Sequence, residues 1–270
     1  MTGLLAGVED VTGGDVTTAR CFVGTSAGSI VAAGLAAGRS PRRPGETADR
    51  SARAGDEAVP AGGGAAVAGA FTRAAGGIAS GTLALATPPG RLLLAGGLRV
   101  VPRGSRSLDA LHRLVERSGA TFDGRLRVCA VERDRGRRVV FGAPGAPTAS
   151  VADAVVASCA IPGVFRPVRI GERTYVDGGA WSPVNVDAAV VREGDRVLVL
   201  EPTAGVLGGA LRGAARMQAL TLRRQGAEVL VVAPDDAAAP LMRRLMDPDR
   251  DGRVLAAGFA QGWRLATSAP

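Results

Sequence analysis

The stretch CFVGTSAGSIVAAGLAAG, from Cys21 to Gly38, places a serine between two glycines where one apolar run gives way to another. Residues 19–24 have the apolar character of a short buried strand, and residues 27–37 have that of a helix. A strand, a tight turn with Ser26 at its tip and a helix that starts at once form the pattern of a nucleophile elbow. We therefore expect this stretch to sit at the centre of an α/β fold.

The two flanking residues, Gly24 and Gly28, complete a Gly-x-Ser-x-Gly pattern. The pattern alone is weak because 39 of the 270 residues are glycine, so a glycine-rich turn that only needs small residues explains it equally well. The turn also points Ser26 at the start of the next helix, where free backbone N–H groups such as that of Ala27 favour an anion. From this motif alone, both interpretations of Ser26 stay open.

The rest of the chain alternates strand and helix signals. Strands are predicted at 125–133 and 137–141, which look like a hairpin or adjacent strands, and at 173–176, 196–202 and 228–235. Helices are predicted at 2–10, 107–119, 150–158, 208–224 and 252–265. Two of the strand segments, 196–202 and 228–235, are continuously apolar, which is typical of strands buried on both faces of a largely parallel sheet. We predict an α/β fold, a three-layer α/β/α sandwich with a mostly parallel central sheet.

The length and the hydrophobic content of 46% are sufficient for one large core. We expect a single domain over residues 1–270. Residues from about 40 to 105 differ in composition: they begin rich in Pro, Gly and Arg and become loosely apolar. This segment is expected to be a mobile, partly helical insertion.

The net charge of +8 would suit a nucleic-acid binder. However, the sequence contains no lysine, its arginines are spread along the chain, and only 3% of the residues are aromatic. Base stacking requires more aromatic side chains than this, so we expect no nucleic-acid partner. A function in binding nucleic acid or an anionic surface stays open, and it is the weakest of the functions considered for this sequence.

The three cysteines, Cys21, Cys129 and Cys159, lie in apolar segments and are odd in number, which favours reduced, buried thiols over a disulfide framework. The first residues lack a basic leader, and no apolar stretch of the length of a membrane span is uninterrupted. We therefore expect a cytoplasmic protein.

A serine hydroxyl needs a base to accept its proton, and the usual histidine is hard to find here. The single histidine, His112, lies on an amphipathic helix segment, and none follows Asp177 as the order of the α/β-hydrolases would require. With no lysine available, a carboxylate must serve. Asp177 is the candidate because it stands where an apolar strand ends in Gly178 and Gly179, although an ordinary turn is an alternative for it.

Together, GTSAG at 24–28 and DGG at 177–179 resemble the patatin-like phospholipase family, whose members use a Ser–Asp dyad without a histidine. SCAIPGVFRPV at 158–168 looks like the family's segment ahead of the aspartate, and WSPVNVDAA at 181–189, with Asn185, looks like the segment that follows it. The resemblance covers the first 40 residues and about 120–235.

This resemblance implies hydrolysis of acyl esters without a metal or cofactor. Ser26 would attack the ester carbonyl, Asp177 would accept its proton, and an acyl-enzyme would form and then react with water. The Ala27 N–H would help to hold the oxyanion, and Gly24, Gly28, Gly178 and Gly179 would shape the two motifs. The partners implied are a lipid or other acyl ester and, transiently, a membrane surface.

One departure from the family concerns the start of the sequence. Family members begin with a strand that leads into a Gly-rich loop, whose N–H groups make the oxyanion hole before the first helix. Here Met1 already lies at the start of the first predicted helix, and the pair Gly13-Gly14 follows that helix. We therefore expect a strand and a Gly-rich loop to be encoded upstream of Met1. The alternative function, a catalytically silent scaffold with a binding or regulatory role, also stays open.

Overall fold

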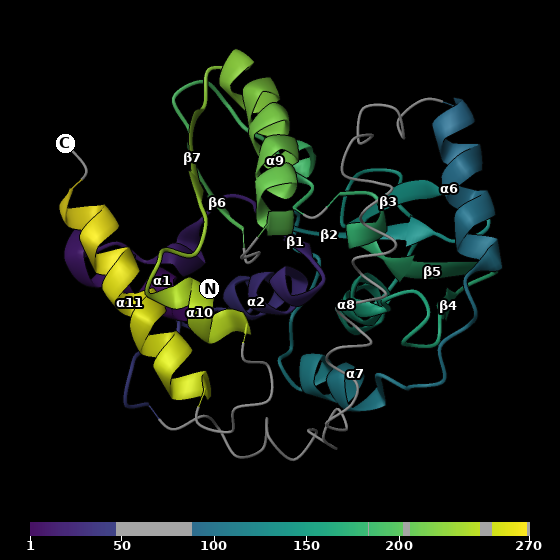
Figure 1. Ribbon diagram of the computed structural model, residues 1–270, viewed down its shortest axis with the longest axis horizontal. Coiled ribbons are helices and arrows are strands. Elements are labelled where there is room, and N and C mark those ends of the chain that lie inside the picture. Colours follow the sequence, from purple (N-terminus) through teal and green to yellow (C-terminus); the bar gives the residue numbers. More distant parts are fainter. Residues whose placement is uncertain (47–87, 183, 202–205, 244–249, 269–270) are drawn as a thin grey trace.

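The first strand, β1 (Phe22–Thr25), lies beside β2 (Leu126–Glu132), which is central to a five-stranded sheet (Figure 1). The computed structural model describes residues 1–46, 88–182, 184–201, 206–243 and 250–268. Phe22 and most residues of β2 are buried, in agreement with the apolar runs that predicted both strands.

Both edges of β2 carry paired strands. One edge is covered by β3 (Arg137–Phe141), which runs antiparallel to residues 128–132. The other edge is shared by two strands, because β1 pairs in parallel with residues 126–129 and β5 (Arg173–Asp177) pairs antiparallel with residues 130–132. β4 (Val168–Ile170) then pairs antiparallel with β5. β1 and β5 therefore meet end to end along the same edge of β2.

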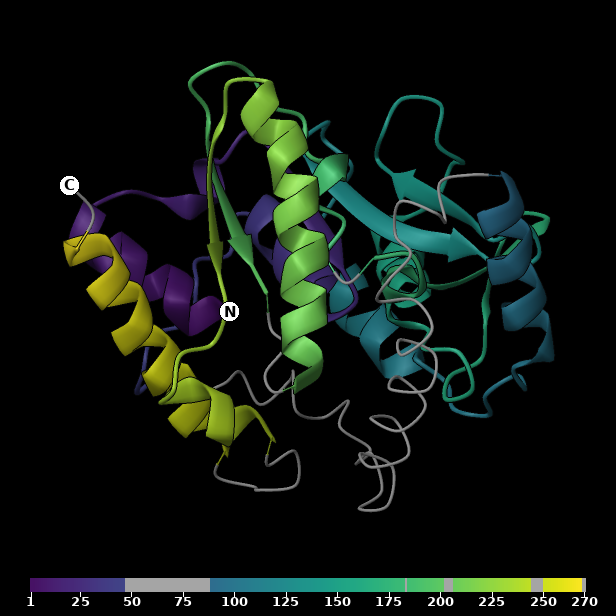
Figure 2. The ribbon, with the colours of Figure 1, turned by 45° about the horizontal axis from the view of Figure 1, so that its top comes forward.

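The two faces of this sheet are covered by different helices, which gives the three predicted layers. On one face, Val128, Ala130 and Tyr175 belong to the largest apolar cluster, to which α2 (Ala27–Ala36), α7 (Asp109–Glu116) and α8 (Val151–Cys159) contribute. Their neighbours Val131 and Val176 point the opposite way, as alternation along a strand requires, and contact α6 (Pro88–Val100). Figure 2 shows α6 along one side of the sheet.

The α/β class is confirmed, and within it the strand pairing is mixed. Among the described strands, β1–β2 and β6–β7 are parallel, whereas β2–β3, β2–β5 and β4–β5 are antiparallel. Short turns connect the strands of the β2–β3 and β4–β5 pairs, which are therefore antiparallel hairpins, whereas β3, α8 and β4 lie between β2 and β5 in the chain. The expectation of a mostly parallel central sheet was therefore wrong in this detail.

A second sheet consists of β6 (Arg196–Leu200) and β7 (Glu228–Val232), which pair in parallel. α9 (Val206–Arg224) covers one face, where its Leu222 packs in a cluster with Val199 and Val229. On the other face Leu198 is 37% exposed and Leu230 is 53% exposed. The expectation that both strands are buried on both faces was therefore wrong, since Leu198 and Leu230 are partly exposed on the face away from α9.

The first and last helices lie side by side, because α1 (Thr2–Thr12) packs along α11 (Arg250–Thr267), and α10 (Ala238–Arg243) also contacts α11 (Figure 1). The predicted insertion at about 40–105 falls mostly on residues 47–87, which lie outside the described residues. Its far end is α6, whose Leu94 and Leu98 are buried against the sheet. No helix in the described part of the chain is both long and apolar enough to span a membrane.

Candidate active site

Ser26 lies at the tip of the turn between β1 and α2, where it is the N-cap residue of the helix. Its backbone has φ 51° and ψ −128°, a conformation that costs a non-glycine residue free energy and that is found at functional sites. Gly24 makes the turn possible, because a Cβ there would lie 2.4 Å from the Ser29 Cα. The strand, turn and helix expected of a nucleophile elbow are therefore present.

The second glycine of the motif has a different role. A Cβ on Gly28 would meet no atom within 4 Å, and Gly28 has no positive φ, so the backbone does not demand glycine there. Gly28 instead lines a cavity of about 500 Å³ between β1 and β6. Of the two glycines of Gly-x-Ser-x-Gly, only Gly24 is thus required by the packing of the turn.

Two buried serines hold the elbow in place. The Ser158 hydroxyl on α8 accepts the Ser26 N–H at 2.9 Å and donates to the Cys129 carbonyl oxygen at 2.7 Å, so it ties the turn to β2. The Ser29 hydroxyl donates to the Ser26 carbonyl oxygen at 2.6 Å. Neither supporting serine was singled out from the sequence, because a hydroxyl that bonds to the backbone leaves no periodic signal.

Asp177 is the last residue of β5 and is 1% exposed. Its Oδ1 accepts the Gly179 N–H at 2.7 Å, and its own N–H donates to the Ala160 carbonyl oxygen at 3.0 Å. Gly178 is required by packing, because a Cβ there would lie 2.2 Å from the Cys129 carbonyl oxygen. The DGG sequence is therefore a tight turn that lies directly against β2.

The sheet brings Ser26 and Asp177 together. Thr25, the residue before the serine, pairs with Cys129, and Asp177 pairs with the next residue of β2, Ala130. The Ser26 side chain is close enough to lower the pKa of the Asp177 carboxyl, although no hydrogen bond between them has standard geometry. Among the described residues Asp177 Oδ2 has no hydrogen-bond partner, so it is free to accept a proton.

Burial dominates the electrostatics of this pair. Loss of solvent raises the pKa of Asp177 to about 6, against the opposing effects of the Gly179 N–H and the Ser26 hydroxyl. At neutral pH the carboxyl is therefore mostly ionised, yet it is a stronger base than an exposed aspartate. That combination suits a general base that must take a proton from a hydroxyl.

An oxyanion would form beside the start of α2. The Ser26 N–H is already bonded to Ser158, so it is not free for a ligand. Ala27 is the first residue of α2, and the first N–H groups of a helix have no carbonyl partner within it. The expected role of the Ala27 N–H in oxyanion binding stays a prediction.

The histidine and the cysteines do not take part in this pair: His112 is bonded elsewhere, and the buried thiols are unreactive. His112 on α7 bonds through Nε2 to Asp153 Oδ1 of α8 at 3.0 Å. All three cysteines are free, and burial raises the pKa of Cys129 and of Cys159 to about 12, so both thiols stay protonated. Within the described ranges no cluster of His, Cys, Asp and Glu could hold a metal ion.

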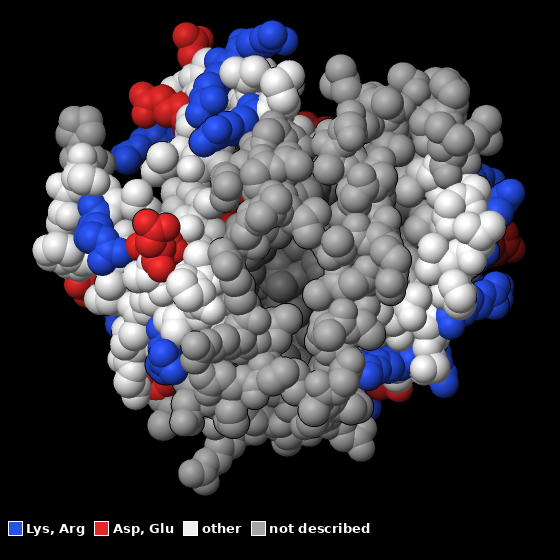
Figure 3. Space-filling model, viewed as in Figure 1, with Lys and Arg blue, Asp and Glu red and all other residues white. Residues whose placement is uncertain are grey.

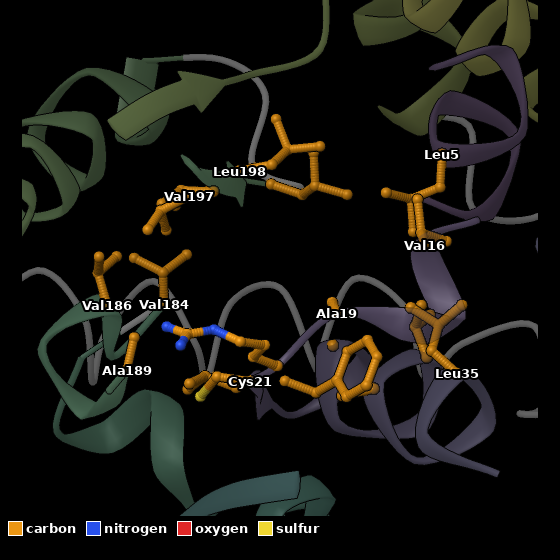
Figure 4. Close-up of a pocket in the computed structure, with 18 of the residues that line it drawn as sticks. Leu5, Val16, Ala19, Cys21, Leu35, Val184, Val186, Ala189, Val197 and Leu198 are labelled. Atoms are coloured by element: carbon orange, nitrogen blue, oxygen red, sulfur yellow. The ribbon is translucent and has the colours of Figure 1, made fainter. Parts of the chain in front are cut away.

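The cavity beside the elbow separates the two sheets. Figure 4 shows Val197 and Leu198 of β6 on one side and Ala19 and Cys21, just ahead of β1, on the other. Leu5 of α1 closes one end. The lining is mostly apolar, so the cavity suits an apolar occupant.

Arginine groups occupy several separate places around the face shown in Figure 3, with acidic groups near some of them. Several arginines are paired with carboxylates, such as Arg125 with Asp123 at 2.7 Å and Arg138 with Asp187 at 2.6 Å. The excess of positive charge is therefore distributed over the surface.

No curated protein matches the chain. A family model does match it: the model of the patatin-like phospholipases covers residues 2–190, which include the elbow, the DGG turn and the five-stranded sheet between them. The match extends over more than half of the chain and includes both expected motifs. The chain therefore belongs to the patatin-like phospholipase family, a family of lipid acyl hydrolases.

Proposed function

We propose that this protein hydrolyses lipid acyl esters with Ser26 as the nucleophile and Asp177 as the general base. The observation that carries the proposal is the end-to-end meeting of β1 and β5 on one edge of β2, which sets the serine beside a buried carboxylate. Such a pair needs no histidine, and His112 is engaged elsewhere by Asp153.

The reaction proceeds in two balanced halves. Ser26 Oγ bonds to the acyl carbon while its proton moves to the Asp177 carboxylate, and the ester C–O bond breaks as Asp177 returns that proton to the leaving alcohol. Asp177 then takes a proton from water, the resulting hydroxide attacks the acyl-enzyme, and the proton is returned to Ser26 Oγ. The products are an alcohol and a carboxylic acid.

The Ala27 N–H and the start of α2 stabilise the oxyanion formed in each half. Each donor of this kind contributes about 10²–10³ to turnover in well-studied hydrolases. The lipid substrate brings the protein transiently to a membrane surface, and the net charge of +8 favours anionic head groups there.

Steady-state hydrolysis of a soluble short-chain ester tests the proposal. Ser26→Ala and Asp177→Asn should each reduce kcat/KM to the background, while Ser40→Ala, which changes an exposed serine, should leave it unchanged. Because the base must be ionised, kcat/KM of the wild type should fall as pH drops through about 6. Full activity in Ser26→Ala would overturn the proposal, and a folded, inactive wild type would favour the silent scaffold.

A further inference from the structure

Asn185 is completely buried and has a left-handed backbone, with φ 47° and ψ 43°. It lies after the DGG turn, at the start of the short helix η3 (Val186–Ala188). Apart from Ser26 it is the only described residue other than glycine with a positive φ. A polar side chain held in such a conformation without solvent must be fixed by its contacts.

The side-chain amide joins the two segments that carry the proposed dyad. Its Nδ2 donates to Thr25 Oγ1 at 3.0 Å and to the Ser182 carbonyl oxygen at 2.7 Å, and the Gly178 carbonyl oxygen lies 3.4 Å away. Thr25 immediately precedes Ser26, and Gly178 immediately follows Asp177. The Asn185 amide therefore contacts the residue before Ser26 and the residue after Asp177.

The amide is held in this orientation from its other end. Asn185 Oδ1 accepts a hydrogen bond from Arg138 Nη1 at 3.2 Å. The Arg138 guanidinium also binds both oxygens of Asp187, at 2.6 and 2.8 Å, and lies 5.7 Å from the centre of the Trp181 ring. A cation on the oxygen side leaves the N–H donors facing Thr25 and Gly178.

We propose that Asn185 is a positioning residue that sets the separation between Ser26 and Asp177. The inference rests on the proposed function, because the dyad is what it positions. The strand pairing alone leaves this separation loosely defined, since β1 and β5 meet only at their ends and share no backbone ladder. The hydrogen bonds of the Asn185 side chain connect the ends of β1 and β5, which no backbone ladder joins.

Two substitutions of Asn185 separate the effect of its amide from the effect of its left-handed backbone. Asn185→Gly keeps the conformation that glycine adopts freely and removes the amide, whereas Asn185→Asp keeps the shape and replaces the donor by an acceptor. The matched control is Gln218→Ala on α9: Gln218 accepts the Val186 N–H at 2.9 Å and donates to Ser182 Oγ at 3.0 Å. Gln218 thus supports the same loop through Val186 and Ser182, not through Thr25 or Gly178.

Three readouts test the proposal on the full chain. Asn185→Gly and Asn185→Asp should lower kcat for the soluble ester by about 10- to 100-fold with KM little changed, because misplacement by about an ångström has this effect. The acid limb of the pH profile should shift below its wild-type midpoint in Asn185→Gly, as water reaches Asp177. Gln218→Ala should lower the Tm and leave kcat and the midpoint unchanged.

Hydrogen exchange separates this inference from the proposed function. Amides of residues 25–27 and 178–179 should exchange faster in Asn185→Gly than in Gln218→Ala, whether or not the wild type hydrolyses the ester. Unchanged exchange at both segments, or wild-type kcat with an unchanged pH midpoint, would overturn the role of Asn185. An inactive wild type would instead count against the proposed function alone.

Discussion

At the scale of single residues, Asp177 combines burial with a negative charge, which is unfavourable for folding. Its pKa in the folded protein is about 6 instead of 3.8, so above pH 6 the ionised form costs about 3 kcal/mol of stability. As pH falls from about 6 to about 4 the folded state binds the proton first, and the cost disappears. Such a loss of folding stability is expected at a catalytic base, whereas a residue that only forms a turn would not be expected to carry it.

We therefore predict that Asp177→Asn raises the free energy of unfolding at pH 8, by up to about 3 kcal/mol, and that the gain shrinks toward pH 4. Urea unfolding at the two pH values measures the difference. Asp134→Asn, at an exposed turn, is the matched control and should change stability little at either pH. A loss of stability in Asp177→Asn at pH 8 would contradict the account of this carboxyl.

The residues of the dyad could be predicted from the sequence, whereas their supports could not. Ser26 and Asp177 each lie at the end of an apolar strand, with glycines one or two positions away, and those features are visible in a sequence. Ser158 and Asn185 act through hydrogen bonds to segments that are distant in the sequence, among them those to Ser26 and to Thr25. Such pairings depend on which strands become neighbours, and one sequence does not state that.

At the scale of elements, the junction of β1 and α2 requires one motif glycine far more than the other. A Cβ at position 24 would overlap the backbone of Ser29, while one at position 28 would enter open space. Within the Gly-x-Ser-x-Gly pattern, the fold therefore constrains position 24 and leaves room for a side chain at position 28.

Gly24→Ala should lower the free energy of unfolding by more than about 2 kcal/mol, because the backbone must move to relieve the overlap. Gly28→Ala should leave stability unchanged or raise it by about 0.5–1 kcal/mol, since alanine favours a helix. Thermal unfolding of the two variants measures both effects. Equal destabilisation by the two changes would show that the turn is not built as described.

Strand positions were predictable from apolar runs, but strand directions were not. The segments at 125–133, 137–141 and 173–176 all form strands close to their expected bounds. Apolar residues report burial and carry no sign of direction, so the antiparallel pairing of β2 with β5 was missed, whereas the short connection between β2 and β3 already allowed a hairpin. Direction follows from the connections, and the short β4–β5 turn allows only the antiparallel arrangement.

At the scale of the whole molecule, the cavity between the two sheets lies beside strands that are paired on one side only among the described strands. β1 has one described strand partner, β2, and β6 has one, β7, so each presents an unpaired edge among the described strands. Residues of both strands, together with Met1, line the cavity of about 500 Å³. Two unpaired edges on an apolar gap are the surroundings in which an additional strand would pair.

The central claim is that Ser26 becomes acylated with the help of Asp177. Intact-mass and peptide spectra after treatment with a fluorophosphonate test it most directly, because the reagent reacts with serines that a base has activated. The account predicts one adduct per chain, located on Ser26, absent from Ser26→Ala and strongly slowed in Asp177→Asn. An adduct on another residue, or equal labelling in Ser26→Ala, would contradict it.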